Sequence, residues 1–204
     1  SSNEYLTRVN LMDAANPHTD TPINLGKKVV VVGGGNTAMD SCRTAKRLGA
    51  DVTLVYRRSE AEMPARLEEV KHAKEEGINF MTLHNPKEYE SDDKGAVKAV
   101  VLDVMQLGEP DASGRRRPEA TGETVTLECD QVIVAVGVSP NPLVPQSIKG
   151  LELGRKNTIA VNDQMQSSIS TIYAGGDIVR GGATVILAMG DGRKAAENMS
   201  NQLA

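Results

Sequence analysis

The chain has 204 residues, 39% of them hydrophobic and 25% charged, and its formal net charge is −4. This balance is typical of a globular protein, and the acidic charge argues against nucleic acid or an anionic membrane as a partner. We expect neither a membrane span nor a secretory signal, and hence a cytoplasmic protein in which Cys42 and Cys129 are reduced core thiols.

The beginning of the chain predicts a helix and a linker. Apolar residues recur at helical spacing over residues 3–12, and a proline-containing stretch follows at 16–22. We assign residues 1–24 to this N-terminal segment, because the first apolar strand follows it.

The most informative stretch is a buried strand that leads directly into a glycine turn and a helix. Residues 29–32 are all valine, as the middle of a parallel sheet requires. Gly33 allows a tight turn, Gly35 allows the backbone to approach a pyrophosphate, and Ala38 takes the place of the usual third glycine. The helix over 37–48 directs its unpaired N–H groups at the phosphates. We expect the pyrophosphate of a dinucleotide to contact Gly33, Gly35, Asn36, Thr37 and Ala38.

A second strand over 51–56 ends in a pair of arginines, Arg57 and Arg58. About twenty residues after the glycines, a dinucleotide-binding fold places the residue that reads the ribose. An acidic residue there would bind a free 2′-hydroxyl, whereas two guanidinium groups suit a 2′-phosphate. The sequence therefore predicts NADP(H) rather than NAD(H). The alternative is an ordinary turn with a solvated arginine pair.

Two further side chains are weaker candidates for the same site. Arg66 can reach the phosphate, or it can pair with Glu62 or Glu69 on its own helix, which the pattern predicts over residues 62–77. Asp40 can approach the nicotinamide amide, although an acidic residue early in a helix also suits the helix dipole.

The middle of the chain predicts a third parallel strand and then a change of pattern. The third strand covers residues 78–83. Strands at 97–104 and 125–127, joined by a polar loop over 108–122, form a β-meander that replaces a crossover helix. Residues 130–136 then return to the central sheet. The fold class is α/β, with a Rossmann-like parallel sheet and a β-meander crossover.

The last third predicts a smaller second unit. A proline-rich loop over 137–142 is a domain edge, followed by short strands at 158–161 and 170–174. Gly176 and Asp177 come next, at the end of a strand. A carboxylate there can bind a hydroxylated ligand, or it can simply cap a helix. The final helix runs from about 183 to 201. Its predicted buried face is Val185, Ala188, Met189, Ala195, Ala196 and Met199.

Other polar residues are not expected to bind a metal or nucleic acid. His18, His72 and His84 lack the spacing of metal ligands. Residues 115–117 are three arginines in a polar loop, which we interpret as a solvated hairpin tip or a contact with a partner subunit.

Several segments resemble the two-dinucleotide-binding flavoproteins, the class that includes thioredoxin reductase. Residues 31–38 and 55–58 resemble the NADPH domain of that class. Residues 133–140, including Gly137, resemble the strand at which those proteins cross back to the FAD domain. Residues 171–177 resemble their second FAD motif.

That motif implies a role for part of the last third. By resemblance, Gly176 and Asp177 face the ribityl and phosphate region of FAD. The backbone near Thr184 and Val185 approaches the flavin ring.

A closer resemblance is to the small (beta) subunit of NADPH-dependent glutamate synthase. Residues 3–11, 56–66 and 107–118 carry it, and it covers essentially the whole chain. It implies that NADPH gives hydride to FAD and that electrons pass through iron–sulfur clusters to a large glutamate synthase-type subunit. Since the cofactors carry this chemistry, we name no catalytic acid or base. The large subunit of NADH-dependent ferredoxin:NADP oxidoreductase belongs to the same family and is an alternative.

Two departures from these families define what we expect of this chain. No Cys-x-x-Cys lies near the NADPH domain, which excludes dithiol chemistry of the thioredoxin reductase kind. The families place the FAD-phosphate fingerprint and the cluster-binding cysteines upstream of these residues. We therefore interpret the chain as a fragment, inactive alone, with an NADP(H)-binding domain at 25–140 and the C-terminal segment of an FAD-binding α/β domain at 141–204. A binding-only NADP(H) sensor is the other hypothesis.

Overall fold

The computed structural model describes residues 1–110 and 114–203. The chain divides into two compact units, Ser1–Val136 and Gly137–Ala204. Among the described residues, none of the helices has both the length and the apolar character needed to cross a membrane.

The first unit contains the dinucleotide-type strand, turn and helix. Its helical elements are α1 (Ser2–Asn10), α2 (Asn36–Arg47), η1 (Glu60–Glu62) and α3 (Leu67–Glu75). Its strands are β1 (Lys28–Val32), β2 (Asp51–Tyr56), β3 (Asn79–Thr82), β4 (His84–Ser91), β5 (Val97–Pro110), β6 (Arg116–Glu128) and β7 (Gln131–Val134).

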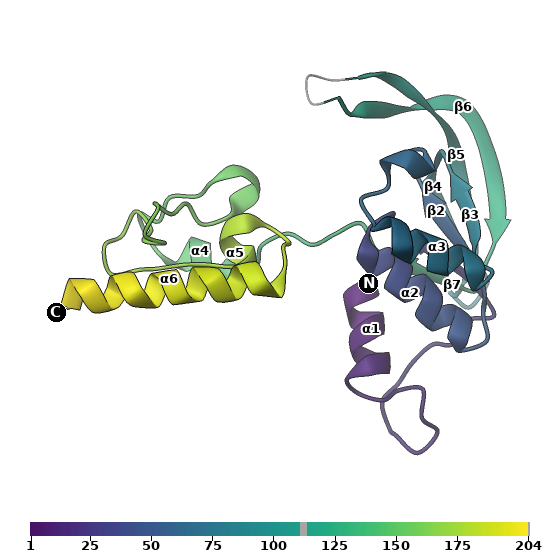
Figure 1. The fold of residues 1–204 in the computed structure, drawn as a ribbon. Helices are drawn as coiled ribbons and strands as arrows, with labels where there is room; N and C mark the ends of the chain where they lie inside the picture. Colours follow the sequence, from purple (N-terminus) through teal and green to yellow (C-terminus); the bar gives the residue numbers. More distant parts are fainter. Residues whose placement is uncertain (111–113, 204) are drawn as a thin grey trace. The chain divides into compact units, whose positions relative to one another are not determined.

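Two sheets organise this unit (Figure 1). The first is parallel in the order β3-β2-β1-β7, and the second is antiparallel in the order β4-β5-β6. In the central strand, Val31 pairs with Leu54 on one side and Ile133 on the other. The predicted α/β fold, the β-meander and the return of the chain to the central sheet are confirmed.

Both faces of the parallel sheet are covered, which explains why β1 is apolar throughout. Val29 and Val31 pack with α1, α2 and α3 in one hydrophobic cluster. Val30 and Val32 pack with residues of the antiparallel sheet in a second cluster, which includes Val100 and Leu102. Complete burial of one such side chain stabilises the fold by about 1.5–3 kcal/mol. The unit therefore has three layers, with the parallel sheet in the middle.

The β-meander is larger than the sequence pattern predicted. β4 was not predicted at all, and the expected polar loop over 108–122 is mostly strand. Met105 pairs with Ala120 and Leu107 with Pro118, so the two long strands continue far along the hairpin. An antiparallel ribbon with one face in water accepts polar residues, and hydropathy alone therefore did not reveal it. Residues 111–113 of the predicted loop lie outside the described residues.

The helix expected over 62–77 begins later than predicted. Residues 60–62 instead form the short η1 turn, in which Ser59 and Glu62 make a capping box. Met63 has extended dihedral angles, as residues that precede a proline commonly do, and α3 starts at Leu67. The result is an irregular segment between the arginine pair and α3.

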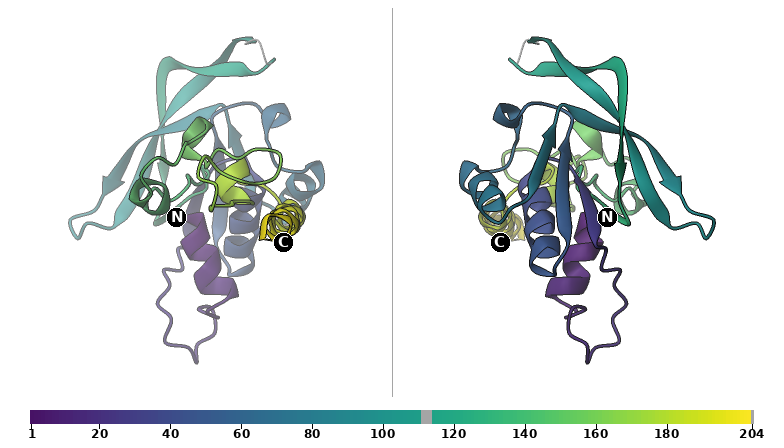
Figure 2. Two further views of the ribbon diagram at one scale, coloured as in Figure 1. Left: turned by 90° about the vertical axis from the view of Figure 1, so that its left-hand side faces the viewer. Right: turned by 90° about the vertical axis from the view of Figure 1, so that its right-hand side faces the viewer.

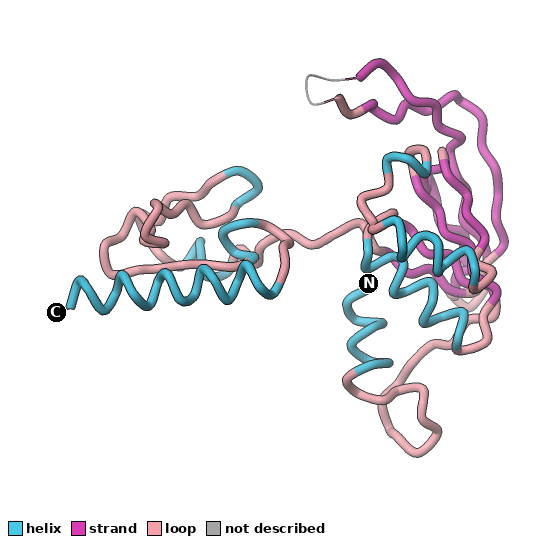
Figure 3. The backbone as a smooth tube through the Cα atoms, viewed as in Figure 1, coloured by secondary structure: helices cyan, strands magenta, loops and turns pink. Residues whose placement is uncertain are grey.

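The second unit consists mainly of loops and helices, as the colouring in Figure 3 shows. Its helical elements are α4 (Leu143–Ser147), η2 (Arg155–Asn157), α5 (Asp177–Arg180) and α6 (Val185–Leu203). The strands expected at 158–161 and 170–174 are reduced to isolated bridges, such as Gln166 with Tyr173.

The predicted buried face of α6 is largely wrong. Val185 is 78% exposed and Met189 is 66% exposed, whereas Ala195 and the charged Asp191 are buried. Helical periodicity identified an apolar stripe correctly, but periodicity cannot say whether residues of this chain cover it.

Candidate dinucleotide site

The glycine turn at the carboxyl end of β1 is shaped partly by the protein itself. The Gly33 N–H donates a hydrogen bond to the carbonyl of Val55 at 3.0 Å, and Gly33 has a φ of +142°. A Cβ at this position would lie 2.3 Å from the carbonyl oxygen of Ala135, and one at Gly34 would lie 2.6 Å from the ring of Tyr56. Both glycines are therefore required for packing, whether or not a ligand binds.

Gly35 differs from its two neighbours. It is the N-cap of α2, with an unstrained φ of −92° and no side-chain cap. A Cβ there would meet only the Cγ of Pro64, at 4.0 Å. No described protein atom therefore requires a glycine at this position. The open space borders the beginning of α2. The Ala38 N–H donates to the Gly35 carbonyl at 3.0 Å, whereas the N–H groups before it are too early in the helix to have an acceptor within it. The position and chemistry of this space fit a pyrophosphate.

Asn36 ties the beginnings of α2 and α3 together. Its Oδ1 accepts a hydrogen bond from the backbone N–H of Arg66 at 2.9 Å, and the N–H of Ala65 donates to the carbonyl of Gly34 at 3.1 Å. The exposed Arg66 is thereby held next to the glycine turn, as the N-cap of α3. Its two alternative partners are engaged elsewhere, Glu69 with Arg43 and Glu62 with Arg116.

The other predicted residues of α2 lie on different faces of the helix. Thr37 is exposed in the first turn, and Ala38 is fully buried against the strand, as close helix packing requires. Asp40 is exposed, and the pKa of its carboxyl group is raised by partial burial and by the charge of Glu69, with Arg43 opposing the shift. Asp40 thus interacts electrostatically with α3, and its contact with a nicotinamide stays a prediction.

The arginine pair follows β2 at the same edge of the sheet. Arg57 is exposed, and Arg58 is half-buried. Arg58 Nε donates a hydrogen bond to the carbonyl of Arg116 in the hairpin at 3.1 Å. A second hydrogen bond fixes the segment that follows the arginine pair, because the Tyr56 hydroxyl donates to the carbonyl of Glu62 at 2.9 Å. The assignment of Arg57 and Arg58 to a 2′-phosphate is untested by these contacts.

In the second unit, Gly175 and Gly176 form the turn that we expected to face FAD, and this turn packs closely against α6. Gly176 has a φ of +73°, and a Cβ on Gly175 would lie 2.6 Å from the Cβ of Asp191. The exposed Asp177 accepts a hydrogen bond from the Ala183 N–H at 3.1 Å, so it fixes the loop before α6. The predicted FAD contacts of these residues remain predictions.

The remaining predicted contacts of the second unit are exposed backbone positions. Gly137 opens the unit with a φ of +95°. Thr184 and Val185 lie exposed where α6 begins.

Asp191 is a structural residue that the sequence reading missed. It is 3% exposed, and its carboxylate accepts hydrogen bonds from Arg180 Nε at 2.7 Å, Arg180 Nη2 at 2.6 Å and the Gly176 N–H at 2.9 Å. The Arg180 guanidinium and the Gly176 amide lower the pKa of Asp191 to about 2. A signal was available, because Asp191 falls at helical spacing between Ala188 and Ala195 on the apolar stripe.

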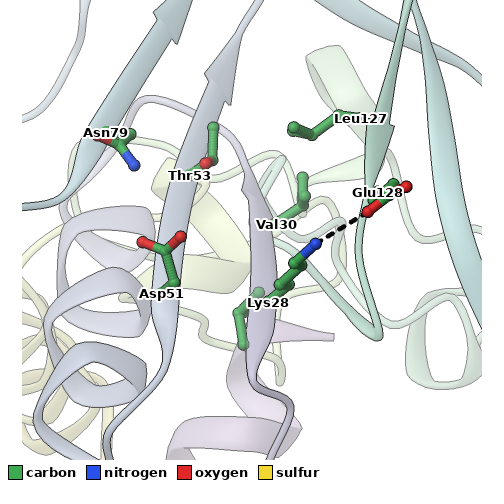
Figure 4. Close-up of a pocket in the computed structure, with 8 residues that line it drawn as sticks. Lys28, Val30, Asp51, Thr53, Asn79, Leu127 and Glu128 are labelled. Carbon is green, nitrogen blue, oxygen red and sulfur yellow. Dashed lines mark hydrogen bonds and ion pairs between the residues drawn. The ribbon is translucent and has the colours of Figure 1, made fainter.

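A cavity of about 400 Å³ lies at the opposite, amino end of the parallel strands (Figure 4). Lys28 and Glu128 form an ion pair of 2.9 Å at its wall, and the side chains of Asp51 and Asn79 also line it. Dinucleotides bind at the carboxyl ends of strands in such sheets, so this cavity is separate from the glycine turn. Within the described ranges, no cluster of three or more His, Cys, Asp and Glu side chains could hold a metal ion.

The chain is similar to several curated proteins over most of its length. The glutamate synthase [NADPH] small chain of Escherichia coli (strain K12) is 42% identical over 184 residues, which cover 87% of this chain and 39% of that protein. The NADP(+)-dependent formate dehydrogenase subunit beta of Moorella thermoacetica is 43% identical over 182 residues, covering 87% of this chain and 25% of that protein. The chain thus spans less than half the length of these relatives.

Solved structures share the fold. Thioredoxin reductase of T. acidophilum superposes with a TM-score of 0.72 at 24% identity, covering 87% of this chain and 53% of that one. FprA of Mycobacterium tuberculosis in complex with NADPH gives a TM-score of 0.70 at 21% identity. The match covers 93% of this chain and 56% of the FprA chain. Residues 3–192 match the sequence model of the pyridine nucleotide-disulphide oxidoreductases. The chain belongs to the pyridine nucleotide-disulphide oxidoreductase family.

Proposed function

We propose that this chain is the NADPH-binding, electron-input part of a flavoprotein oxidoreductase, in which hydride passes from NADPH to FAD. Residues 25–140 form the NADP(H)-binding domain, and residues 141–204 contribute the C-terminal segment of the FAD-binding domain. Residues 1–24 form a helix and a linker that precede the NADP(H)-binding domain.

The space at Gly35 is the observation that carries the nucleotide assignment. A glycine that no described protein atom requires stands at the beginning of α2, where helical N–H groups and the helix dipole favour an anion. Arg57 and Arg58 follow the adjacent strand at the same edge, and their guanidinium groups suit a second phosphate on the ribose.

Relatives support NADP(H) over NAD(H). The glutamate synthase small chain, the formate dehydrogenase beta subunit and the NADPH-Fe(3+) oxidoreductase subunit beta of Geobacter sulfurreducens are all named for NADPH or NADP⁺. As a member of this family, the protein would leave the hydride transfer itself to the nicotinamide and flavin rings. The residues of this chain bind and orient the nucleotide, and none is assigned as a general acid or base.

The second unit supports a partial FAD site. Gly176 and Asp177 form a hydrogen-bonded turn beside the exposed start of α6, whose apolar residues Val185, Ile186 and Met189 are 66–78% exposed. Exposed apolar surface of this kind commonly marks an interface. We assign that interface to the remainder of the FAD domain, since the relatives are more than twice as long as their matched segments.

We extend the proposal to the wider electron path by resemblance to the glutamate synthase small subunits. We propose iron–sulfur clusters in the upstream portion of the protein and a large glutamate synthase-type subunit as the partner, with ferredoxin-linked relatives as the alternative. The proposed location is the cytoplasm.

The test uses the longer protein that includes the upstream portion. Purified protein should be yellow, and anaerobic NADPH should bleach its flavin absorbance, while equimolar NADH does so much more slowly. Gly35→Ala in the same protein should retain the flavin but lose rapid bleaching. Colourless protein that still binds NADPH would contradict the flavoprotein assignment and favour a sensor.

A further inference from the structure

The β5–β6 hairpin reaches the segment that carries the arginine pair. Figure 2 shows the long hairpin extending beyond the end of the parallel sheet. Its residue Arg116, the first of β6, contacts this segment twice. Its carbonyl accepts from Arg58 Nε at 3.1 Å, and its own Nε forms an ion pair with Glu62 Oε1 at 3.3 Å. Two residues 58 positions apart in sequence therefore lie side by side.

Among the residues that the structure describes, both arginines keep their outer nitrogens available. Arg58 and Arg116 are each held through Nε, and no contact within the described residues engages the Nη atoms of either side chain. The Arg116 side chain is 43% exposed. A guanidinium fork with free Nη groups matches the oxygens of a phosphate monoester.

Glu62 fixes the Arg116 side chain in this place. One oxygen of its carboxylate accepts from the Ser59 backbone N–H at 3.3 Å and from the Ser59 hydroxyl at 2.9 Å, which leaves the other for Arg116. Burial alone would raise the pKa of Glu62, but the Ser59 hydrogen bonds and the charge of Arg116 lower it overall. The carboxylate therefore stays ionised at neutral pH, and the guanidinium has a fixed partner.

We propose that Arg116 is a further guanidinium that recognises the 2′-phosphate of NADP(H), supplied by the antiparallel sheet rather than by the nucleotide-binding strands. This inference rests on the proposed function, because it presumes that Arg57 and Arg58 mark the phosphate. It gives the outer portion of the β5–β6 hairpin, where Arg116 contacts Arg58, a role in coenzyme specificity.

Binding of NADPH, NADH and 2′,5′-ADP to the full chain at fixed ionic strength tests the proposal. Arg116→Ala should weaken NADPH and 2′,5′-ADP about tenfold, because a charge-assisted hydrogen bond is lost, and leave NADH unchanged. Arg116→Lys should give an intermediate loss, since it keeps the charge but not the fork. The Arg58 contact survives both changes, because it uses the backbone carbonyl of residue 116.

Arg117→Ala is the matched control. Arg117 is the next residue of the same strand, carries the same charge, is exposed and points to the opposite face of the ribbon. It should bind NADPH as the wild type does. Equal losses for Arg116→Ala and Arg117→Ala would overturn the proposal in favour of a general charge effect.

The same titrations distinguish the role of Arg116 from the proposed function. If Arg57→Ala with Arg58→Ala weakens NADPH but Arg116→Ala does not, the inference about the hairpin is wrong and the proposed function stands. If the double variant also leaves NADPH binding unchanged, the proposed function itself fails. Circular dichroism and thermal unfolding of each variant show whether it keeps the wild-type secondary structure and stability.

Discussion

The carboxylate of Asp191 accepts two hydrogen bonds from the guanidinium of Arg180, at 2.7 and 2.6 Å. The same carboxylate accepts the Gly176 N–H at 2.9 Å, in a buried position on α6. A single helical side chain therefore fixes the turn that presents Asp177. A bidentate, charge-assisted pair is a stronger anchor than the glycine turn could provide alone.

Replacing Asp191 with asparagine should loosen this turn. The neutral amide cannot accept both guanidinium bonds, so hydrogen exchange of the Gly176 amide should become faster and thermal unfolding should occur at lower temperature. Hydrogen-exchange mass spectrometry of peptides that span residues 174–181 measures the first effect. Unchanged exchange in Asp191→Asn would contradict the anchoring role.

The pH dependence of this anchor has a definite sign. The pKa of Asp191 is lowered to about 2 in the folded chain, from an ordinary value near 3.8. A lowered carboxyl pKa contributes stability that is present above the unfolded value and is lost as the pH falls through the folded value. The difference in stability between wild type and Asp191→Asn should therefore be constant near neutral pH and shrink between about pH 4 and pH 2.

Replacement by alanine should lower stability at Gly33 and weaken NADPH binding at Gly35. Gly33→Ala forces a clash with the backbone of Ala135 at a positive φ, and should lower the free energy of unfolding by about 2 kcal/mol or more. Gly35→Ala meets open space, and should leave stability within about 0.5 kcal/mol of wild type while weakening NADPH binding more than about tenfold. Urea unfolding and calorimetric titration separate the two effects.

Gly182→Ala is the control for this pair, because a Cβ there also meets open space and its φ is unstrained. It should change neither property. Wild-type NADPH affinity in Gly35→Ala would show that the space at the N-terminus of α2 is not the pyrophosphate site.

Arg43 clamps α2 to α3 and should contribute measurably to stability. Its side chain is 20% exposed, and it pairs with Glu69 at 2.6 Å and with Glu76 at 2.8 Å. Arg43→Ala should lower the free energy of unfolding by about 1–2 kcal/mol, a value between those of exposed and buried pairs. Arg193, 84% exposed and 4.0 Å from Glu197, is the control, and its replacement by alanine should cost under about 0.5 kcal/mol.

Both cysteines should be unreactive in the folded chain. Cys42 and Cys129 are buried and unpaired, and burial raises the pKa of each thiol, with Asp130 adding to the effect at Cys129. The thiolate is the reactive form, so Ellman's reagent at pH 8 should label neither residue in native protein and both in denaturant. Rapid stoichiometric labelling of native protein would contradict this assignment.

The sequence predicted the parts of the fold that depend on local periodicity and turn chemistry. Four consecutive valines between a linker and a glycine turn define β1, and the apolar stripe beginning at Ala38 defines α2. Gly35 and the arginine pair could be singled out because the chemistry of phosphate recognition places them at known distances along the chain.

What sequence reasoning missed depends on contacts between distant segments. The polar strands of the hairpin are stable because they pair with each other, and the contact of Arg116 with Arg58 exists only in the folded chain. Asp191 was missed because its burial depends on the partner that Arg180 provides. The exposed apolar face of α6 shows the same limit, since a pattern reveals an interface but not what covers it.

Calorimetric titration of NADPH and NADH against the wild type and the Arg57→Ala, Arg58→Ala double variant tests the central claim most directly. If the guanidinium groups hold a 2′-phosphate, the double variant should lose about 100-fold in affinity for NADPH and less than about threefold for NADH. Equal losses for the two coenzymes, or a wild type that does not prefer NADPH, would contradict the account.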